Sequence, residues 1–379
     1  MTDKTVYDLI IAGAGIHGAA IAHQAVSNGL SVLVLEQYDR AARATSGRSS
    51  KLIHGGLRYL ESFNFKLVRE CLLDRQRLLE QYPDLVRMRR FFIPIYKNTN
   101  RSRFTINAGL TLYGLLGAGG KYSRHRKIPK KDWDALDGIK QDELLAVYQY
   151  WDAQTDDAKL TSRLLQEAQA PNKGPKAEVI FNASVEMCER NGDKLRVKYL
   201  QEDVPVVAHG RHFINATGPW VNDTLAKCKP SVEGLPVDLV QGTHLELPGQ
   251  LKKGIYYFEA PQDKRAVFAM PWYGKILFGT TETVYRGDPA EVKPTMLEES
   301  YLLTIFNYYF PDNPVERTDV ISSWAGLRVL PSSEASPFKR SRDTIFHKDD
   351  DNDPRILSIY GGKLTSHYST AEKLLKLLR

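Results

Sequence analysis

The stretch YDLIIAGAGIHGAAIAHQAVSNGLSVLVLE, residues 7–36, decides the fold of this 379-residue chain. Its first six residues form a nearly continuous apolar run, typical of a parallel strand buried on both faces. A G-x-G-x-x-G pattern follows at the first turn, then an apolar helix over 16–28 and a second strand ending in Glu36. Glycines at the first turn of a βαβ unit, with an acid closing the second strand, indicate dinucleotide binding. We therefore expect an α/β fold with a parallel sheet.

Each part of this unit has a physical role toward the dinucleotide. Gly13 permits the tight turn, Gly15 lets the backbone approach the pyrophosphate, and Gly18 lets the helix pack closely on the strand. The helix N-terminus adds amides and a partial positive charge. Glu36 can accept both ribose hydroxyls, which argues against a 2′-phosphate. The predicted contacts of this unit are Gly13, Ala14, Gly15, Ile16, His17, Gly18, Glu36 and Gln37.

A second stretch, ATSGRSSKLIHGGLRYL at residues 44–60, distinguishes FAD from NAD better than the βαβ unit does. Its hydroxyls can donate to a second phosphate and to a ribityl chain, and the segment after them would lie along an isoalloxazine ring. The hydroxyls are Thr45, Ser46, Ser49 and Ser50, and the segment is Lys51, Leu52, Ile53 and His54. The cations Lys51, His54 and Arg58 suit an anionic substrate. The alternative for this stretch is a polar surface loop.

Composition limits the classes of protein that fit. A net charge of +7 permits anionic substrates, an anionic membrane surface or nucleic acid, but no nucleic-acid-binding signature is present. No apolar run reaches the ~18–20 residues of a membrane-spanning helix. The start of the sequence lacks the pattern of a signal peptide, so we expect a cytoplasmic location or one on a surface facing the cytoplasm. The three cysteines form no CxxC and are expected to be buried thiols, and we expect no metal site.

The run ATSGRSSKLIHGGLRYLE resembles the flavin-binding segment of FAD-dependent glycerol-3-phosphate dehydrogenases, within the D-amino-acid-oxidase-like superfamily. Later segments resemble further motifs of that family, in the same order: RHFINATGPW at 211–220, WAGLRVLP at 324–331 and YGGKLTSHY at 360–368. Many members continue past the point where this sequence ends, into a further helical domain. The resemblance implies FAD contacts from Val185, Ala216, Thr217, Gly218, Trp220, Gly326, Arg328, Gly362, Lys363, Leu364 and Thr365.

The resemblance also implies a Rossmann-like FAD domain with an inserted substrate domain built on a mixed or antiparallel sheet. We expect the FAD domain to hold residues 1–85, 150–235 and 318–379, and the substrate domain to hold 86–149 and 236–317. Alternation over 239–282 predicts an antiparallel sheet. Residues 178–181 and 196–199 are predicted as strands around an Asn191-Gly192 turn, and residues 151–168 as a helix.

The reaction implied by the resemblance is oxidation of sn-glycerol 3-phosphate to dihydroxyacetone phosphate, with hydride transfer from C2 to flavin N5. Four cations would converge on the substrate. Arg58 and Arg328 would clamp the phosphate, and Lys363 would stabilise the oxyanion. His54 is the expected base, since an imidazole has an unperturbed pKa of about 6.5, with Lys363 as the rival. The substrate contacts would include Tyr59 and Thr280.

Three alternatives remain open from the sequence. The chain could oxidise a 2-hydroxy acid or an amine, or it could be a flavoprotein that binds nucleic acid. The electron acceptor could be a quinone or oxygen. Apolar residues between clusters of cations over 101–122 fit an interfacial membrane contact, which would favour a quinone, but they also fit a core helix with basic ends.

Overall fold

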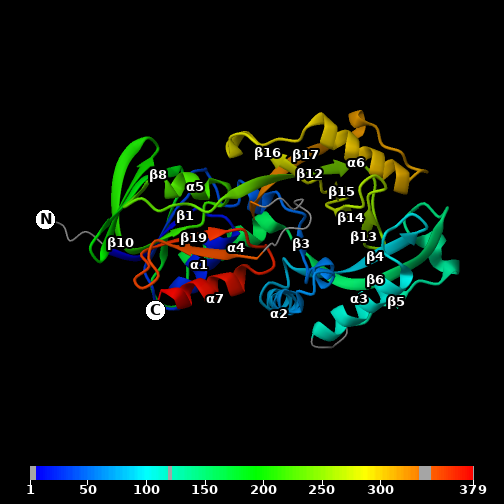
Figure 1. Cartoon of the computed structure of the whole chain (residues 1–379), viewed down its shortest axis with the longest axis horizontal. Helices are drawn as coiled ribbons and strands as arrows, with labels where there is room; N and C mark the ends of the chain where they lie inside the picture. The colour runs from blue at the N-terminus through cyan, green and yellow to red at the C-terminus, as the bar shows by residue number, and fades with distance from the viewer. Residues whose placement is uncertain (1–5, 118–121, 333–342, 379) are drawn as a thin grey trace.

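The computed structural model describes residues 6–117, 122–332 and 343–378. Two sheets lie end to end along the long axis of the molecule, with the N- and C-termini at the outer end of the first (Figure 1). In spatial order the described strands of the first sheet are β11 (Cys228–Lys229), β8 (Ala183–Asn191), β9 (Lys194–Gln201), β10 (Val204–Asn215), β1 (Val6–Ala12), β2 (Val32–Leu35) and β7 (Ala177–Ile180). Two further strands extend this sheet, β19 (Ile356–Tyr360) beside β10 and β18 (Ile345–Lys348) beside β19.

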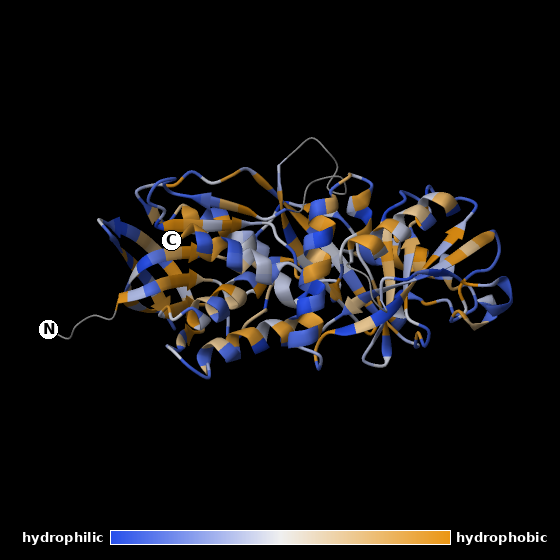
Figure 2. Cartoon of the chain, turned by 90° about the horizontal axis from the view of Figure 1, so that it is seen from below, coloured by the Kyte–Doolittle hydropathy of each residue, from blue (hydrophilic) through white to orange (hydrophobic). Residues whose placement is uncertain are grey.

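The centre of the first sheet is parallel, as the apolar runs predict. β1 pairs in parallel with both β2 and β10, and β10 pairs in parallel with β19. β2 and β19 are buried along their whole length, and β1 and β10 are buried toward their carboxyl ends. Orange, hydrophobic stretches predominate among the strands near the N-terminus (Figure 2). The α/β class is confirmed at this level.

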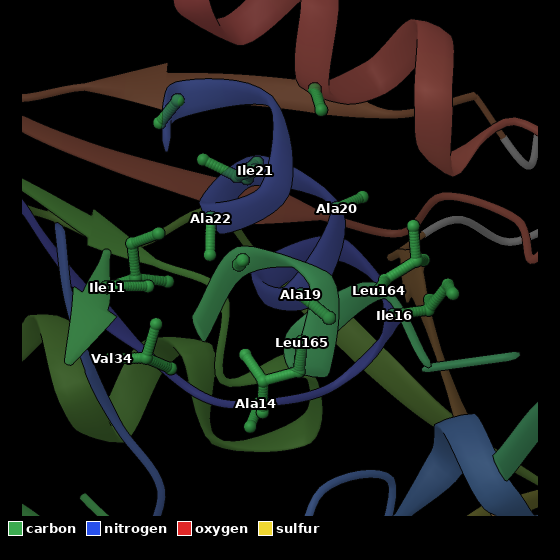
Figure 3. Packing of buried hydrophobic residues seen from close by; sticks show 14 of the residues in the cluster. Ile11, Ala14, Ile16, Ala19, Ala20, Ile21, Ala22, Val34, Leu164 and Leu165 are labelled. Atoms are coloured by element: carbon green, nitrogen blue, oxygen red, sulfur yellow. The ribbon is translucent and has the colours of Figure 1, made fainter. Parts of the chain in front are cut away.

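Small residues let helix α1 (Ile16–Ser27) lie close to the sheet. Ala19 and Ala22 are completely buried, and Figure 3 shows them between Ile11 and Val34 of the strands and Leu165 of α4 (Asp157–Gln169). A Cβ atom on Gly18 would lie 1.9 Å from the carbonyl oxygen of Gly13, so only glycine fits there. This packing fixes the N-terminus of α1 at the carboxyl end of β1.

The second sheet is mixed and mostly antiparallel. Its described strands run in the order β16 (Thr283–Tyr285), β12 (Val237–Leu247), β15 (Lys275–Gly279), β14 (Ala266–Trp272), β13 (Ile255–Glu259), β4 (Arg87–Tyr96), β6 (Leu144–Gln154) and β3 (Leu52–Ile53). β17 (Ser322–Pro331) pairs with β12, and β5 (Arg126–Lys127) pairs with β6. Aromatic residues join one face to α6 (Met296–Tyr309), where Phe258 stacks on Tyr309 with ring centroids 4.2 Å apart.

Helix α2 (Phe65–Gln81) lies between the two sheets, α7 (His367–Leu377) packs against α1 of the first sheet, and α3 (Arg103–Leu116) packs against β6 of the second (Figure 1). A short helix, α5 (Val221–Leu225), follows β10. Helix α3 is amphipathic: Tyr113 lies on its buried face, whereas Phe104 is 82% exposed and Leu115 is 74% exposed. Among the described residues, no helix is both long enough and apolar enough to span a membrane.

Two local predictions are wrong. Residues 151–154 belong to strand β6, and helix α4 begins only at Asp157, because Asp156 caps it by accepting from the amide of Lys159 at 3.0 Å. The hairpin at Asn191 joins β9 to β8, whereas the predicted strand at 178–181 is β7 (Ala177–Ile180), which pairs with β2. The three cysteines are buried and free, as expected. The division into domains with the boundaries given above stays a prediction.

Candidate functional site

A cavity of about 360 Å³ opens where the carboxyl ends of β1, β2 and β10 face the second sheet. Most of the predicted site residues line it. They are Gly13, Gly15, Ile16, His17, Glu36, Gln37, Thr45, Ser46, Ser49, Ser50, Leu52, His54, Tyr59, Val185, Ala216, Thr217, Gly218, Trp220, Gly326, Arg328, Gly362, Lys363, Leu364 and Thr365. The predicted residues outside its wall are Ala14, Gly18, Lys51, Ile53, Arg58 and Thr280.

One end of the cavity has the shape that a pyrophosphate needs. Gly13 has φ +101°, and a Cβ atom there would lie 2.6 Å from the carbonyl oxygen of Ala216. The first glycine turn and the segment after β10 can therefore meet only if this residue is glycine. The amide of Ile16, at the start of α1, donates to the Ser46 hydroxyl at 2.8 Å. Amides and hydroxyls from two distant stretches thus converge at a helix N-terminus.

The Glu36 carboxylate is fixed at the same end. One oxygen accepts from the amide of Ala14 at 2.6 Å and the other from the amide of Tyr38 at 3.0 Å. Burial raises the pKa of Glu36, and these backbone hydrogen bonds oppose the rise. Each oxygen keeps a lone pair for a ribose hydroxyl, since a carboxylate offers about four acceptor positions.

The opposite end of the cavity is cationic. His54 follows β3; its amide donates to the Thr365 hydroxyl at 3.0 Å, and that hydroxyl donates to the His54 carbonyl at 3.3 Å. Lys363 lies just before α7 with its Nζ 4.1 Å from the centre of the Tyr59 ring. This Nζ is buried and has no hydrogen-bond partner among the described residues. A buried ammonium of this kind is costly unless a ligand supplies an acceptor.

Arg328 comes from β17 and also faces the cavity. Its Nη1 lies 3.1 Å from Glu282 Oε1, and its Nη2 lies 3.4 Å from the Thr280 hydroxyl. Thr280 therefore reaches the site through Arg328. Arg58 lies behind Tyr59, with its guanidinium 5.9 Å from the centre of that ring.

Lys51 is placed differently from what its position in the sequence suggested. Its ammonium lies 2.6 Å from Asp157 Oδ1 and 2.6 Å from the Gly47 carbonyl, and the side chain is 6% exposed. The ammonium thus holds the stretch 44–54 from behind, against the start of α4, and does not line the cavity.

His244 was missed by the sequence reasoning. It lies on β12, fully buried, with Nε2 2.9 Å from the Ser50 hydroxyl and its ring stacked on Trp324 at 5.8 Å. Burial lowers the pKa of His244 well below its ordinary value, and Arg328 and Lys51 lower it further, so the imidazole is neutral. The signal in the sequence was a histidine in the apolar strand that contains Gly242. Gly242 and His244 both line the cavity.

A family model described as FAD dependent oxidoreductase matches residues 8–368. The chain belongs to this family. It is 36% identical to aerobic glycerol-3-phosphate dehydrogenase of Bacillus subtilis (strain 168), over 100% of this chain and 68% of the relative. It is 33% identical to D-erythritol 1-phosphate dehydrogenase of Brucella abortus (strain 2308), over 98% of this chain and 74% of the relative.

Solved structures agree in fold. Glycerol-3-phosphate dehydrogenase from Bacillus halodurans, complexed with FAD, superposes with a TM-score of 0.77 at 27% identity. The match covers 99% of this chain but only 64% of that one. L-α-glycerophosphate oxidase from Mycoplasma pneumoniae, with FAD bound, also gives 0.77, at 18% identity and with 99% and 95% covered.

These findings confirm the D-amino-acid-oxidase-like fold, and the cofactor is FAD. The residues present fit this cofactor, because the close approach at Gly13 provides a turn for the pyrophosphate and the Glu36 carboxylate provides an acceptor for a ribose hydroxyl. The chain is an FAD-dependent oxidoreductase.

Proposed function

We propose that this chain oxidises a phosphorylated polyol, with sn-glycerol 3-phosphate as the substrate and dihydroxyacetone phosphate as the product. Bound FAD supplies the hydride acceptor. The observation that carries the proposal is the buried Lys363 ammonium, which has no hydrogen-bond partner among the described residues and lies in the same cavity wall as His54 and Arg328. A small substrate that brings both a hydroxyl and a dianionic phosphate satisfies all three groups.

Each side chain has a distinct role in this proposal. His54 accepts the proton of the C2 hydroxyl, and Lys363 holds the same oxygen as negative charge develops on it. Arg328 binds the phosphate, where a guanidinium can make two parallel hydrogen bonds. Arg58 adds positive charge from behind Tyr59, and Thr280 orients Arg328. Lys363 and the neutral His244 are the rival bases.

D-Erythritol 1-phosphate is the second candidate substrate. The relative that bears this substrate in its name is 33% identical over 98% of this chain, which is close to the 36% of the glycerol-3-phosphate relative. Both substrates present a phosphate and a secondary hydroxyl, so the same cations serve either one. A 2-hydroxy acid or an amine brings no phosphate, so Arg328 would have no phosphate oxygen to bind.

The test is anaerobic mixing of the FAD-loaded protein with each substrate while flavin absorbance is followed. Glycerol 3-phosphate should bleach the flavin rapidly, and Arg328→Ala should slow this more than ~100-fold, because truncating a charged group that binds the substrate costs several kcal/mol. Arg317→Ala, at an exposed arginine paired with Glu299, is the matched control and should change nothing. If only D-erythritol 1-phosphate bleaches the flavin, the substrate is that phosphorylated polyol and not sn-glycerol 3-phosphate. Bleaching only by hydroxy acids or amines would refute the proposal.

We further propose that the electron acceptor is a quinone at the cytoplasmic face of a membrane, and that α3 contacts this membrane surface. The support is that Phe104 and Leu115 are both exposed on α3 and that Arg103 at its start and Arg124 after it are exposed too, since exposed apolar residues together with cations suit an anionic bilayer surface. Phe104→Ser combined with Leu115→Ser should abolish flotation with vesicles of phosphatidylcholine and phosphatidylglycerol. Leu297→Ser, at an 84% exposed leucine on α6, should not. Equal flotation of both variants would refute the contact.

A further inference from the structure

Three buried side chains meet behind the turn that carries His54. Tyr113 is a buried residue of α3, Asp152 of β6 and Arg75 of α2; Figure 1 shows these three elements. The Tyr113 hydroxyl donates to Asp152 Oδ2 at 2.7 Å and accepts from the amide of Gly55 at 2.7 Å. Arg75 donates to Asp152 Oδ1 and, at 3.2 Å, to the carbonyl of Trp151. The chain of contacts ends on the residue directly after the proposed base.

The turn itself has little freedom. A Cβ atom on Gly55 would lie 2.6 Å from the Tyr113 hydroxyl and 2.6 Å from Leu72, so the backbone is pressed against this wall. Gly56 has φ +78°, a conformation that glycine adopts without strain. On its other side, His54 is held through its own amide and carbonyl by Thr365. Two hydroxyls from two different parts of the chain therefore fix the backbone on both sides of the imidazole.

The hydroxyl of Tyr113 suits this task because it is both a donor and an acceptor. Burial and the nearby Asp152 carboxylate raise the pKa of Tyr113 well above its ordinary value, so the proton stays on the phenol. The hydroxyl donates its hydrogen bond to the Asp152 carboxylate, so its oxygen lone pair is free to accept from the Gly55 amide. Arg75 neutralises Asp152, which is 1% exposed, and so makes the buried carboxylate tolerable.

We propose that Tyr113 and Asp152 are positioning residues that set the place of His54 in the cavity. The inference rests on the proposed function, because it assigns His54 the proton transfer. Neither residue lines the cavity, so neither touches the substrate. They act by holding the Gly55 amide, and thereby the imidazole, at a fixed distance from the reacting oxygen. A displacement of about 1 Å at such a site can cost ~100-fold in rate.

The test compares Tyr113→Phe with a matched control in the FAD-loaded protein. Tyr96→Phe also removes one buried phenolic hydroxyl, which donates to the Lys140 carbonyl at 2.8 Å; the Tyr96 ring packs against Tyr309 and does not line the cavity. Tyr113→Phe should lower kcat ~10–100-fold with KM changed less than ~3-fold, because only the proton transfer is misaligned. Tyr96→Phe should leave kcat unchanged. Equal effects of the two variants would show a merely structural role and overturn the inference.

A double variant distinguishes action through His54 from any other route. In a His54→Ala background, Tyr113→Phe should have no further effect on kcat, since residues that act as a unit are not additive. A full additional loss in that background would overturn the inference. If Tyr113→Phe does not bind FAD, Asp152→Asn takes its place, because it keeps an oxygen acceptor for Tyr113. It should give a smaller loss of kcat with the same dependence on His54, and an unchanged kcat would overturn the inference.

A final readout does not depend on the substrate. Amide hydrogen exchange in the segment 53–58 of the FAD-loaded protein should be faster in Tyr113→Phe than in wild type, and unchanged in Tyr96→Phe, because the Gly55 amide loses its acceptor. Unchanged exchange in Tyr113→Phe would refute the inference. If no phosphorylated polyol bleaches the wild-type flavin, the proposed function fails, and the exchange result alone then decides whether Tyr113 fixes this turn.

Discussion

Replacing Lys51 by methionine tests how the stretch 44–54, which lines part of the cavity, is supported. The Lys51 ammonium lies 2.6 Å from Asp157, whose side chain is completely buried. The second oxygen of Asp157 accepts from the amide of Ser49 at 3.0 Å and from its hydroxyl at 2.6 Å. Lys51→Met keeps the length and packing of the side chain but removes the charge, so a buried carboxylate loses its cation.

The expected cost is large. Removing one partner of a buried ion pair typically destabilises a protein by ~3–5 kcal/mol, a substantial share of the ~5–15 kcal/mol that holds a native domain together. Burial already raises the pKa of Asp157 and Lys51 opposes the rise, so the variant should also bind a proton at a higher pH. The loop 44–50, which Asp157 holds through Ser49, should loosen, and FAD should dissociate more readily.

The assay is urea unfolding of the FAD-free protein, together with the ratio of flavin to protein absorbance after purification. Lys373→Met is the matched control, because its ammonium pairs with Glu70 at 2.9 Å but is 54% exposed. An exposed pair contributes ~0–1 kcal/mol. A loss in Lys51→Met no greater than in Lys373→Met, with FAD retained, would refute the reasoning. The double variant Lys51→Met with Asp157→Asn should recover part of the loss, since no uncompensated charge then remains.

Two further predictions concern Gly13 and two buried histidines, His17 of α1 and His367 of α7. Gly13→Ala should yield protein without flavin, because its Cβ atom would lie 2.6 Å from the Ala216 carbonyl oxygen. The control Gly29→Ala, with no atom within 4 Å of the added Cβ, should retain FAD. Flavin absorbance after purification measures this, and a yellow Gly13→Ala protein would contradict the geometry. Burial lowers the pKa of His17 and of His367 from 6.5 to about 4. Between pH 6.5 and pH 4 both imidazoles are therefore neutral in the folded protein but protonated in the unfolded chain. The contribution of these two histidines to the unfolding free energy should therefore be fully present above pH 6.5, and it should be lost as the pH falls from 6.5 to 4. Urea midpoints at pH 7 and pH 5 measure this, and a drop that is the same in His17→Asn would be evidence against it.

The parts of the fold that the sequence predicts well are those that depend on neighbouring residues. The βαβ unit is one, because the apolar period, the glycines and Glu36 all lie within 30 residues of each other. The strand at 151–154 is the opposite case. Trp151 and Asp152 extend β6 because they pair with Arg90 and Arg89 of β4, some 60 residues earlier. No local pattern indicates that partner, and the acids at 156–157 suggested a helix that in fact starts later.

The same distinction applies to the site. The glycines and hydroxyls around the cavity were predictable because a dinucleotide requires those residue types. The partners of the cations were not. Lys51 pairs with Asp157 and Arg328 pairs with Glu282, and each pair joins residues that only the tertiary fold brings together. His244 was not predicted for a related reason: a single histidine in an apolar strand indicates no function by itself, and its partner Ser50 is 194 positions earlier in the sequence.

In the proposed function, the position of His54 makes the proton transfer depend on both sheets. His54 directly follows β3, which pairs with β6 of the second sheet, while its backbone is bound by Thr365 next to α7 of the first. A shift of one sheet relative to the other would therefore move the imidazole away from Lys363, which lies in the same segment as Thr365. Substitutions in β6, or on the face of α3 that packs against it, should change the rate of flavin reduction, whereas substitutions at the outer hairpin of β8 and β9 should change stability alone.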